Sequence, residues 1–248
     1  MPLFFALPEN ISESEKVILI YGKDAKHIIK SLRYKKNDEI LIANGKGNKY
    51  ITIIESIESN LIKCKIIKSI STPLNTHPTK VVLAQALVKS NKMDFIVQKS
   101  TELGINAIIP FISSRTIPII NRNNLEKKQR RWQKIAYEAS KQSERSIIPE
   151  ISSIITFNEL LNKSANFDLP LLFWENERSI NLKDILTSLP KPDTILGLIG
   201  PEGGFSEEEI RIAKEAGLTA VSLGNHYLRS ETAALFVLSV ITYIFDIL

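Results

Sequence analysis

From residue 80 onward, short apolar runs alternate with longer amphipathic segments, and this alternation limits the fold more than any other feature of the chain. The short runs have the length of buried strands, and the longer segments repeat apolar residues three and four positions apart, as helices do. Such alternation produces a mostly parallel sheet with helices on its faces. The predicted strands are 80–88, 105–111, 169–174, 194–200 and 219–224. The predicted helices are Asn91–Leu103, Leu125–Gln142, Ser206–Ala216 and Ser230–Phe245. Ser206 and Glu209 have the spacing of a capping box that opens the third of these helices.

The first part of the chain has a different pattern. Its short apolar runs are separated by turn residues, and Asn44-Gly45 marks a tight turn between two of them. Closely spaced short strands predict a small β-barrel. Residues 71–80 contain two prolines among polar neighbours, which indicates a linker. We therefore predict two domains, a β-barrel over residues 1–72 and an α/β domain over residues 73–248.

Positive charge is concentrated in residues 122–145. This segment has eight basic and three acidic residues, so its net charge of +5 equals the net charge of the whole chain. Concentrated basic charge is typical of a nucleic-acid-binding surface, although a solvated helix face gives the same pattern. The basic residues are Arg122, Lys127, Lys128, Arg130, Arg131, Lys134, Lys141 and Arg145.

A glycine-rich segment, GPEGG at residues 200–204, joins the predicted strand 194–200 to the helix that follows. Glycines let a ligand approach the backbone, and the free N–H groups at the start of a helix can bind it. The spacing matches neither the dinucleotide-binding fingerprint nor a phosphate-binding loop. The segment is therefore a ligand-binding loop of another kind or a glycine-rich turn.

Leu223–Ala233 places charged residues where a strand ends and the last helix begins. Arg229 and Glu231 flank Ser230, which is a suitable N-terminal cap for that helix. Ligands of open α/β sheets bind at the carboxyl ends of strands, so the pair is a candidate site. A surface ion pair between the two is the alternative. His226 has the chemistry of a general base, but a single histidine in a loop is more often polar surface.

The composition excludes several classes of protein. The single cysteine, Cys64, rules out an intrachain disulfide and a cysteine-based zinc site, and the three histidines lie far apart. The N-terminal residues lack the basic region of a signal peptide. The apolar run 233–245 is too short to span a bilayer and predicts a buried helix. We therefore expect a cytoplasmic protein with no metal and no membrane segment.

Taken together, four segments resemble a known family. Their order and spacing are similar to those of the SPOUT-superfamily enzymes that methylate N3 of a uridine in 16S ribosomal RNA. His27, Arg33 and the Asn44-Gly45 turn are similar to the PUA-like barrel of those enzymes, so the resemblance covers nearly the whole chain. The four segments are 89–104, 131–145, 198–209 and 223–233.

The resemblance implies an α/β SPOUT methyltransferase domain with a C-terminal trefoil knot, preceded by a small PUA-like β-barrel. Three loops of the knot would bind S-adenosyl-L-methionine, mainly through backbone groups around the adenine. The residues that the resemblance assigns to the cofactor are Trp174, Glu175, Ile199, Gly200, Pro201, Glu202, Gly203, Gly204, Leu223, Gly224, Tyr227, Leu228, Arg229 and Thr232.

The resemblance also implies a homodimer that acts on the 16S rRNA of the small ribosomal subunit, at the uridine at position 1498 in the standard numbering. From the place of Arg229 and Glu231 at the end of the loop, we expect Arg229 to stabilise negative charge on the uracil oxygens, and Glu231 to accept the N3 proton or orient Arg229. A methyltransferase of another RNA and a non-catalytic ribosome-binding or assembly protein are the alternatives. The implied RNA-binding residues are Arg33, Arg122, Lys127, Lys128, Arg130, Arg131, Lys134 and Arg145.

At four positions the chain departs from the usual pattern of the family. His226 and Tyr227 stand where the family has an arginine followed by an isoleucine. Glu144 stands where it has a glycine, and Ser230 where it has a threonine. The differences fall just after the basic helix and around the start of the last helix.

Overall fold

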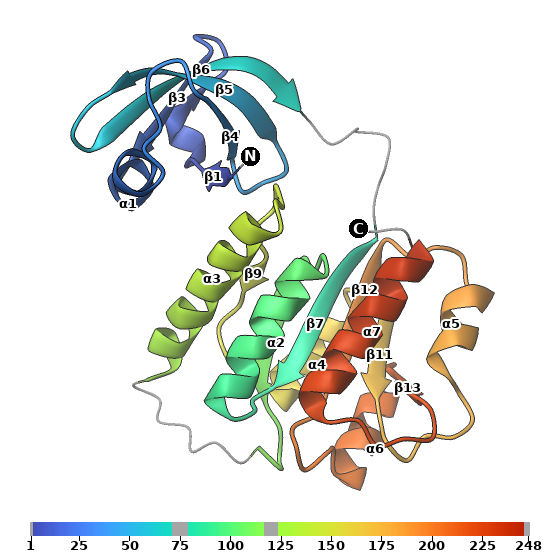
Figure 1. The fold of residues 1–248 in the computed structure, drawn as a ribbon. Helices are drawn as coiled ribbons and strands as arrows, with labels where there is room; N and C mark the ends of the chain where they lie inside the picture. The colour runs from blue at the N-terminus through green and yellow to red at the C-terminus, as the bar shows by residue number, and fades with distance from the viewer. Residues whose placement is uncertain (1, 71–78, 117–123, 246–248) are drawn as a thin grey trace. The chain divides into compact units, whose positions relative to one another are not determined.

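The computed structural model describes residues 2–70, 79–116 and 124–245, and the chain divides into two compact units (Figure 1). The first unit combines residues 1–76 with 140–148, and the second combines residues 77–139 with 149–248. The predicted domain boundary between residues 72 and 73 lies outside the described residues, as does most of the predicted linker. That boundary stays a prediction.

The first unit is built on a mixed six-stranded sheet in the order β1-β4-β5-β6-β3-β2. Only β1 and β4 run parallel, and the other neighbours are antiparallel. In the described part of the chain β1 and β2 form the two edges, so the expected small barrel is a half-barrel. The strands are β1 (Leu3–Phe5), β2 (Ile11–Ser12), β3 (Val17–Tyr21), β4 (Glu39–Ala43), β5 (Lys49–Ile57) and β6 (Leu61–Ile70), and the short helices are η1 (Pro8–Asn10), α1 (Gly22–Lys26) and η2 (His27–Ser31).

Alternate residues of these strands point into one apolar core, as the period of two along a strand requires. Ile40 and Ile42 of β4 are fully buried, and so are Ile62 and Cys64 of β6. Burial raises the pKa of the Cys64 thiol to about 12, so the thiol stays protonated at neutral pH and is a poor nucleophile. The half-barrel therefore has a core of its own.

The second unit contains the parallel sheet that the alternating pattern predicted. Its strand order is β10-β8-β7-β12-β11-β13, with β9 also paired to β8, and every neighbouring pair is parallel. All five predicted strands form, and β9 and β10 are two short strands that the pattern did not indicate. The strands are β7 (Lys80–Ala86), β8 (Ala107–Ile112), β9 (Glu150–Ile151), β10 (Ile155–Thr156), β11 (Leu169–Phe173), β12 (Thr194–Ile199) and β13 (Thr219–Val221).

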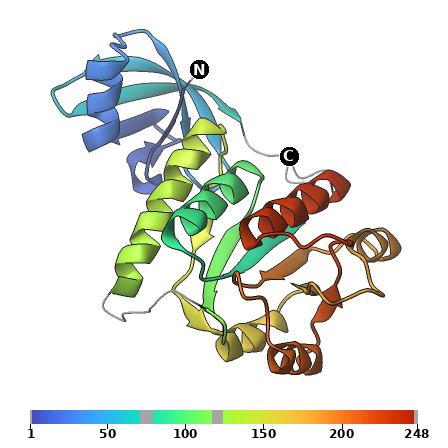
Figure 2. The same ribbon diagram turned by 60° about the horizontal axis from the view of Figure 1, so that its bottom comes forward.

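Helices cover both faces of this sheet, and the two layers separate in Figure 2, where α2 and α7 lie above the strands and α4 and α6 below them. The four predicted helices form, and α4 and α5 are additional. Capping boxes begin α4 at Thr156 and α6 at Ser206, the second as predicted. The helices are α2 (Ser90–Glu102), α3 (Leu125–Gln142), α4 (Phe157–Ser164), α5 (Leu182–Ser188), α6 (Glu207–Glu215) and α7 (Ser230–Phe245).

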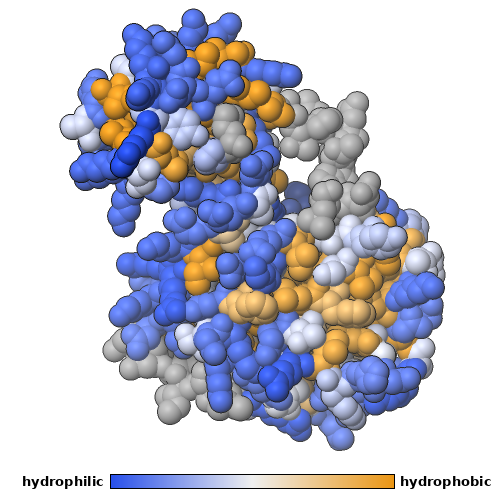
Figure 3. All heavy atoms as spheres, in the orientation of Figure 1, coloured by the Kyte–Doolittle hydropathy of each residue, from blue (hydrophilic) through white to orange (hydrophobic). Residues whose placement is uncertain are grey.

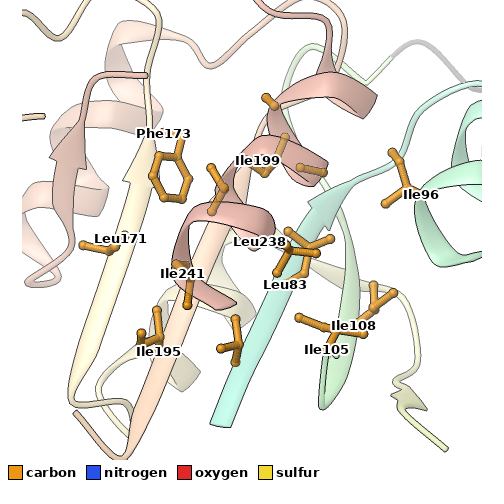
Figure 4. Close-up of a cluster of buried hydrophobic side chains, with 14 of the residues drawn as sticks. Leu83, Ile96, Ile105, Ile108, Leu171, Phe173, Ile195, Ile199, Leu238 and Ile241 are labelled. Carbon is orange, nitrogen blue, oxygen red and sulfur yellow. The ribbon is translucent and has the colours of Figure 1, made fainter. Parts of the chain in front are cut away.

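The larger apolar core lies between the sheet and the helices α2 and α7 (Figure 4). Leu238 and Ile241 of α7 point toward the strands and are almost fully enclosed, which confirms the prediction of a buried C-terminal helix. Among the described residues, no helix has the length and apolar character to cross a membrane. The strand residues labelled in this cluster are Leu83, Ile108, Leu171, Phe173, Ile195 and Ile199.

The end of α3 and the turn after it belong to the first unit. Lys141 Nζ pairs with Asp24 Oδ1 at 2.8 Å, and Lys46 forms a β-bridge with Ile147. Glu144 in this turn has φ +52°, in the left-handed region. Arg145 N donates to Ser140 O, and Glu144 N donates to Lys141 O, which is the Schellman pattern that usually places glycine at this position. This explains the glycine that the family pattern has where this chain has Glu144.

We expect Glu144→Gly to stabilise the protein. A left-handed conformation costs a residue with a Cβ about 1–2 kcal/mol, and the extra unfolded-state entropy of glycine offsets roughly 0.5–1 kcal/mol of the gain. The free energy of unfolding should therefore rise by roughly 0.5–1 kcal/mol, measured by urea denaturation. As a control, Glu138→Gly in the exposed interior of the same helix should lower it by about 1 kcal/mol. A Glu144→Gly protein less stable than the parent would contradict this account.

Candidate functional site

A cavity of about 540 Å³ opens at the carboxyl edge of the parallel sheet in the second unit. The strand register explains the position of the cavity, because Gln85 of β7, Ile199 of β12 and Phe173 of β11 are paired side by side at the ends of their strands. The loops that leave these strands, together with the loop after β13, therefore meet at one edge. The lining residues are Lys92, Phe173, Trp174, Glu175, Ile199, Gly200, Pro201, Glu202, Gly203, Gly204, Phe205, Leu223, Gly224, His226, Tyr227, Leu228, Arg229, Ser230 and Ala233.

The loop after β12 needs its glycines because other groups pack directly against its backbone. A Cβ at Gly200 would lie 3.2 Å from the Phe205 ring. A Cβ at Gly204, where φ is +66°, would collide with Glu175 Oε1 of the loop after β11. Side chains at these positions would displace the neighbouring loop, so the glycines keep two walls of the cavity close together.

A chain of buried hydrogen bonds fixes this loop to the start of α7. Gln85 Nε2 at the end of β7 donates to Ser230 Oγ at 2.9 Å, and Ser230 Oγ donates to the carbonyl of Gly200 at 2.6 Å. Gln85 is fully buried, and its Oε1 has no hydrogen-bond partner among the described residues. Buried polar groups are costly to leave unpaired, so these bonds hold β7, β12 and α7 in register at the edge of the cavity.

Lys92, in the first turn of α2, joins two carboxylates of the cavity wall. Its Nζ lies 3.4 Å from Glu202 Oε1 and 3.2 Å from Glu231 Oε2. The Glu202 carboxylate also accepts a long hydrogen bond of 3.5 Å from Lys89 N at the start of α2. One lysine therefore connects the glycine-rich loop with the first turn of α7.

Arg229 lines the same cavity and is exposed, and no ion pair of its side chain is present among the described residues. The surface ion pair with Glu231, considered as an alternative from the sequence, is not formed there, since Glu231 pairs with Lys92 instead. The Arg229 guanidinium can therefore bind an electronegative group that enters the cavity.

The structure brings together thirteen of the fourteen residues that the sequence assigned to a cofactor. The exception is Thr232, which is exposed on α7 on the side opposite the buried Ala233 and Ala234. Glu231 does not line the cavity itself, and it reaches it through Lys92. The lining residues that sequence reasoning did not assign are Lys92, Phe173, Phe205, His226, Ser230 and Ala233.

The predicted RNA-binding residues that the structure describes do not line this cavity. On α3, Lys127 and Lys134 are exposed, Lys128 is partly buried, and Arg130 and Arg131 pair with Glu126 and Asp94. These residues form a basic helix surface. In the first unit, Arg33 is exposed. Arg145 is half-buried, and burial lowers the pKa of its guanidinium to about 10. Arg122 lies outside the described residues.

Further contacts brace the loops around the cavity. Arg115 Nη1 donates to the carbonyl of Gly203 at 3.0 Å. The buried Glu209 of α6 accepts hydrogen bonds from Ser114 N and Oγ, both at 2.8 Å, and from Ser206 N at 2.9 Å. The segment after β8 is thus tied to Gly203 in the glycine-rich loop and to the first turn of α6, which follows that loop. In the described part of the chain, no cluster of three or more histidine, cysteine or acidic side chains has the geometry of a metal site.

These features define an α/β protein with a ligand cavity built from loops at the carboxyl edge of a parallel sheet. A family model for an RNA methyltransferase domain matches residues 75–242, and a model for an RNA methyltransferase PUA domain matches residues 20–67. The chain therefore belongs to the RNA methyltransferase family that has these two domains.

Individual relatives agree over almost the full length. The chain is 33% identical over 245 residues to the ribosomal RNA small subunit methyltransferase E of Bacillus subtilis, covering 97% of this chain and 95% of the relative. It is similar, with TM-score 0.85 and 33% identity, to the crystal structure of the enzyme of that name from Neisseria gonorrhoeae bound to S-adenosyl methionine, covering 99% and 98% of the two chains. A Legionella pneumophila methyltransferase in complex with the same cofactor gives TM-score 0.83 and 29% identity, covering 97% and 96%.

The loop after β11, which carries Trp174 and Glu175, contains a carboxylate that should make the stability of the protein depend on pH. The Glu177 carboxylate in this loop accepts hydrogen bonds from Ser179 Oγ, Ser179 N and Arg178 N at 2.6, 2.9 and 3.0 Å. These bonds, the one from Ser179 Oγ above all, lower the pKa of Glu177 from 4.5 to about 2. Because the folded pKa is the lower one, the stabilisation is complete above about pH 4.5 and is lost as the pH falls toward 2.

We therefore expect Glu177→Gln to lower the free energy of unfolding at pH 7 by on the order of 2 kcal/mol, the usual size for hydrogen bonds to a charged group. The difference from the parent protein should shrink steadily between pH 4.5 and pH 3 in urea titrations. Glu207→Gln, at an exposed position of α6, is the control and should change stability by less than about 0.5 kcal/mol at each pH. A Glu177→Gln effect that is constant with pH would contradict the assignment.

Proposed function

We propose that this chain transfers the methyl group of S-adenosyl-L-methionine to N3 of a uridine in the 16S rRNA of the small ribosomal subunit, at position 1498 in the standard numbering. The observation that carries the proposal is the cavity at the carboxyl edge, in a chain that belongs to an RNA methyltransferase family. The names of the relatives support the small-subunit substrate, and the cofactor in two similar structures supports the methyl donor.

The residues around the cavity suit this cofactor. The glycine-rich backbone and the apolar side chains of Phe173, Trp174 and Leu228 offer a surface for an adenine ring. The carboxylates of Glu175 and Glu202 suit the positive charges of a sulfonium and an ammonium group. The cofactor, when bound, supplies a methyl group that is already activated by the positive sulfur.

The protein's own task is then to orient the uracil and to favour the loss of its N3 proton. N3 lies between two carbonyl oxygens, and negative charge develops on them when the proton leaves. Arg229 would donate hydrogen bonds to these oxygens and stabilise that charge. Glu231 would accept the proton or orient Arg229. Because Glu231 pairs with Lys92 and not with Arg229, its effect on Arg229 would be indirect. In the transfer, the N3–carbon bond forms as the sulfur–carbon bond breaks, and the N3 proton leaves to a base or to water.

RNA binding is assigned to the basic surface of α3 and to the PUA-like first unit, which would contact phosphates without reading sequence. This assignment rests on the exposed Lys127 and Lys134 and on the matched PUA model. The trefoil threading implied by the resemblance and the cytoplasmic location expected from the sequence composition belong to the same proposal. The strand order, with β12 inserted between β7 and β11, is compatible with the knot.

A homodimer is also part of the proposal. Phe236 and Tyr243 are exposed on α7, and Phe95 is exposed on α2. Figure 3 shows apolar side chains gathered on the surface of the second unit over these helices. Exposed apolar patches of this kind mark protein interfaces. Sedimentation equilibrium tests this part, and a monomer at micromolar concentration would rule it out.

The function is tested by methyl transfer from labelled cofactor to small subunits that lack the modification, with the product nucleoside identified by mass spectrometry. We expect N3-methyluridine at one site. Methylation of a different RNA would favour the first alternative. Absence of transfer, with subunits that a family member does methylate, would favour a non-catalytic ribosome-binding or assembly protein.

We expect Arg229→Ala to lower the turnover number by about 100- to 1000-fold, the usual effect of removing a donor to a developing negative charge. Because Arg229 is assigned to charge stabilisation, the dissociation constant of the cofactor should change far less than turnover. Arg211→Ala is the matched control, since Arg211 lies outside the cavity on α6 and pairs with Glu208 and Glu215. Full turnover in the Arg229→Ala protein would rule out the assigned role.

A further inference from the structure

Lys92 lies at the centre of an unusual arrangement of charges. It is one of two positively charged side chains lining the described cavity, and the other is Arg229. Lys92 is held between the carboxylates of Glu202 and Glu231, whereas Arg229 has no ion pair among the described residues. The side chains of Lys92, Glu202 and Glu231 are only 24%, 20% and 17% exposed. Their charges are therefore poorly screened by solvent and depend on one another.

The Glu231 carboxylate would be costly to leave without a positively charged partner. Its Oε2 is buried and meets Lys92 as an ion pair without hydrogen-bond geometry, so no hydrogen bond to it is present among the described residues. Without Lys92, two largely buried carboxylates would be left without a cation. The other cationic side chain that lines this cavity is Arg229, which is two residues before Glu231 in the sequence. Leaving a buried charge unpaired is expensive, so Arg229 would be drawn to the carboxylates.

We infer that Lys92 is a positioning residue: it holds Glu202 and Glu231 so that the Arg229 guanidinium stays free to bind the substrate. Lys92 does not need to touch the reacting atoms for this role. Its contribution to turnover rests on the proposed function, but its effect on the state of Arg229 does not. The two can therefore be measured separately.

The direct test is the reactivity of Arg229 toward phenylglyoxal, which modifies free guanidinium groups faster than paired ones, followed by peptide mass spectrometry. We expect Arg229 to react at least 5-fold more slowly in Lys92→Met than in the parent protein. Lys92→Arg should react like the parent, because an arginine can still bridge both carboxylates. The triple variant Lys92→Met, Glu202→Gln, Glu231→Gln should recover the fast reaction, because nothing is left to pair with Arg229.

Arg33, exposed in the first unit, is the internal reference and should react equally in all variants. Lys92→Gln replaces Lys92→Met if the latter does not fold, and the same slower reaction of Arg229 is expected. An unchanged rate at Arg229 in the folded variant would overturn the inference, and so would a slow rate that persists in the triple variant. A parent protein that transfers no methyl group would contradict the proposed function. The reactivity of Arg229 would still decide the role of Lys92 in that case.

In the active enzyme, Lys92→Met should reduce methyl transfer at least 10-fold, and Lys92→Arg should retain most of it. A purely structural lysine would lower the melting temperature without changing the reactivity of Arg229 in the folded protein. Loss of turnover with unchanged Arg229 reactivity would therefore also contradict the inference.

Discussion

The cavity depends on one buried chain of hydrogen bonds, from Gln85 through Ser230 to the carbonyl of Gly200. It joins three segments that are far apart in sequence: the end of β7, the loop after β12 and the start of α7. Of these, β7 and β12 are neighbours in the sheet. Because these polar groups are buried, breaking any one bond would leave another group unpaired. The position of Ser230 is thereby fixed, and with it the positions of Arg229 and Glu231 on either side.

Near Ser230, some charged side chains of the cavity form ion pairs and one does not. Glu202 and Glu231 are engaged by Lys92, and Arg229 is left open toward the cavity. A substrate whose reacting nitrogen lies between two carbonyl oxygens needs a donor of this type when its proton leaves. The glycine-rich backbone and the apolar side chains of Phe173, Trp174 and Leu228 form another part of the cavity wall. Surfaces of this kind suit the nucleoside part of a cofactor.

Much of this could be predicted from the sequence, because glycines, caps and strand lengths have strong local preferences. The parallel sheet, the capping box at Ser206 and the two loops around Gly200 and Leu223 were expected on that basis. The role of Lys92 was not expected, because no local sequence pattern indicates which distant residues a lysine in the first turn of a helix will contact. Glu144 shows the same limit, since only its positive φ explains why glycine suits that position. Thr232 faces outward because the buried face of α7 is set by tertiary packing.

We propose that three loops at the carboxyl edge of one parallel sheet form the cofactor site. The measurement is amide hydrogen exchange with and without saturating S-adenosyl-L-methionine, because it locates a binding site without requiring turnover. We expect slower exchange in residues 174–176, 199–204 and 223–229, and little change in α3 or the half-barrel. Cofactor binding that leaves these three segments unchanged and protects another part of the chain would contradict it.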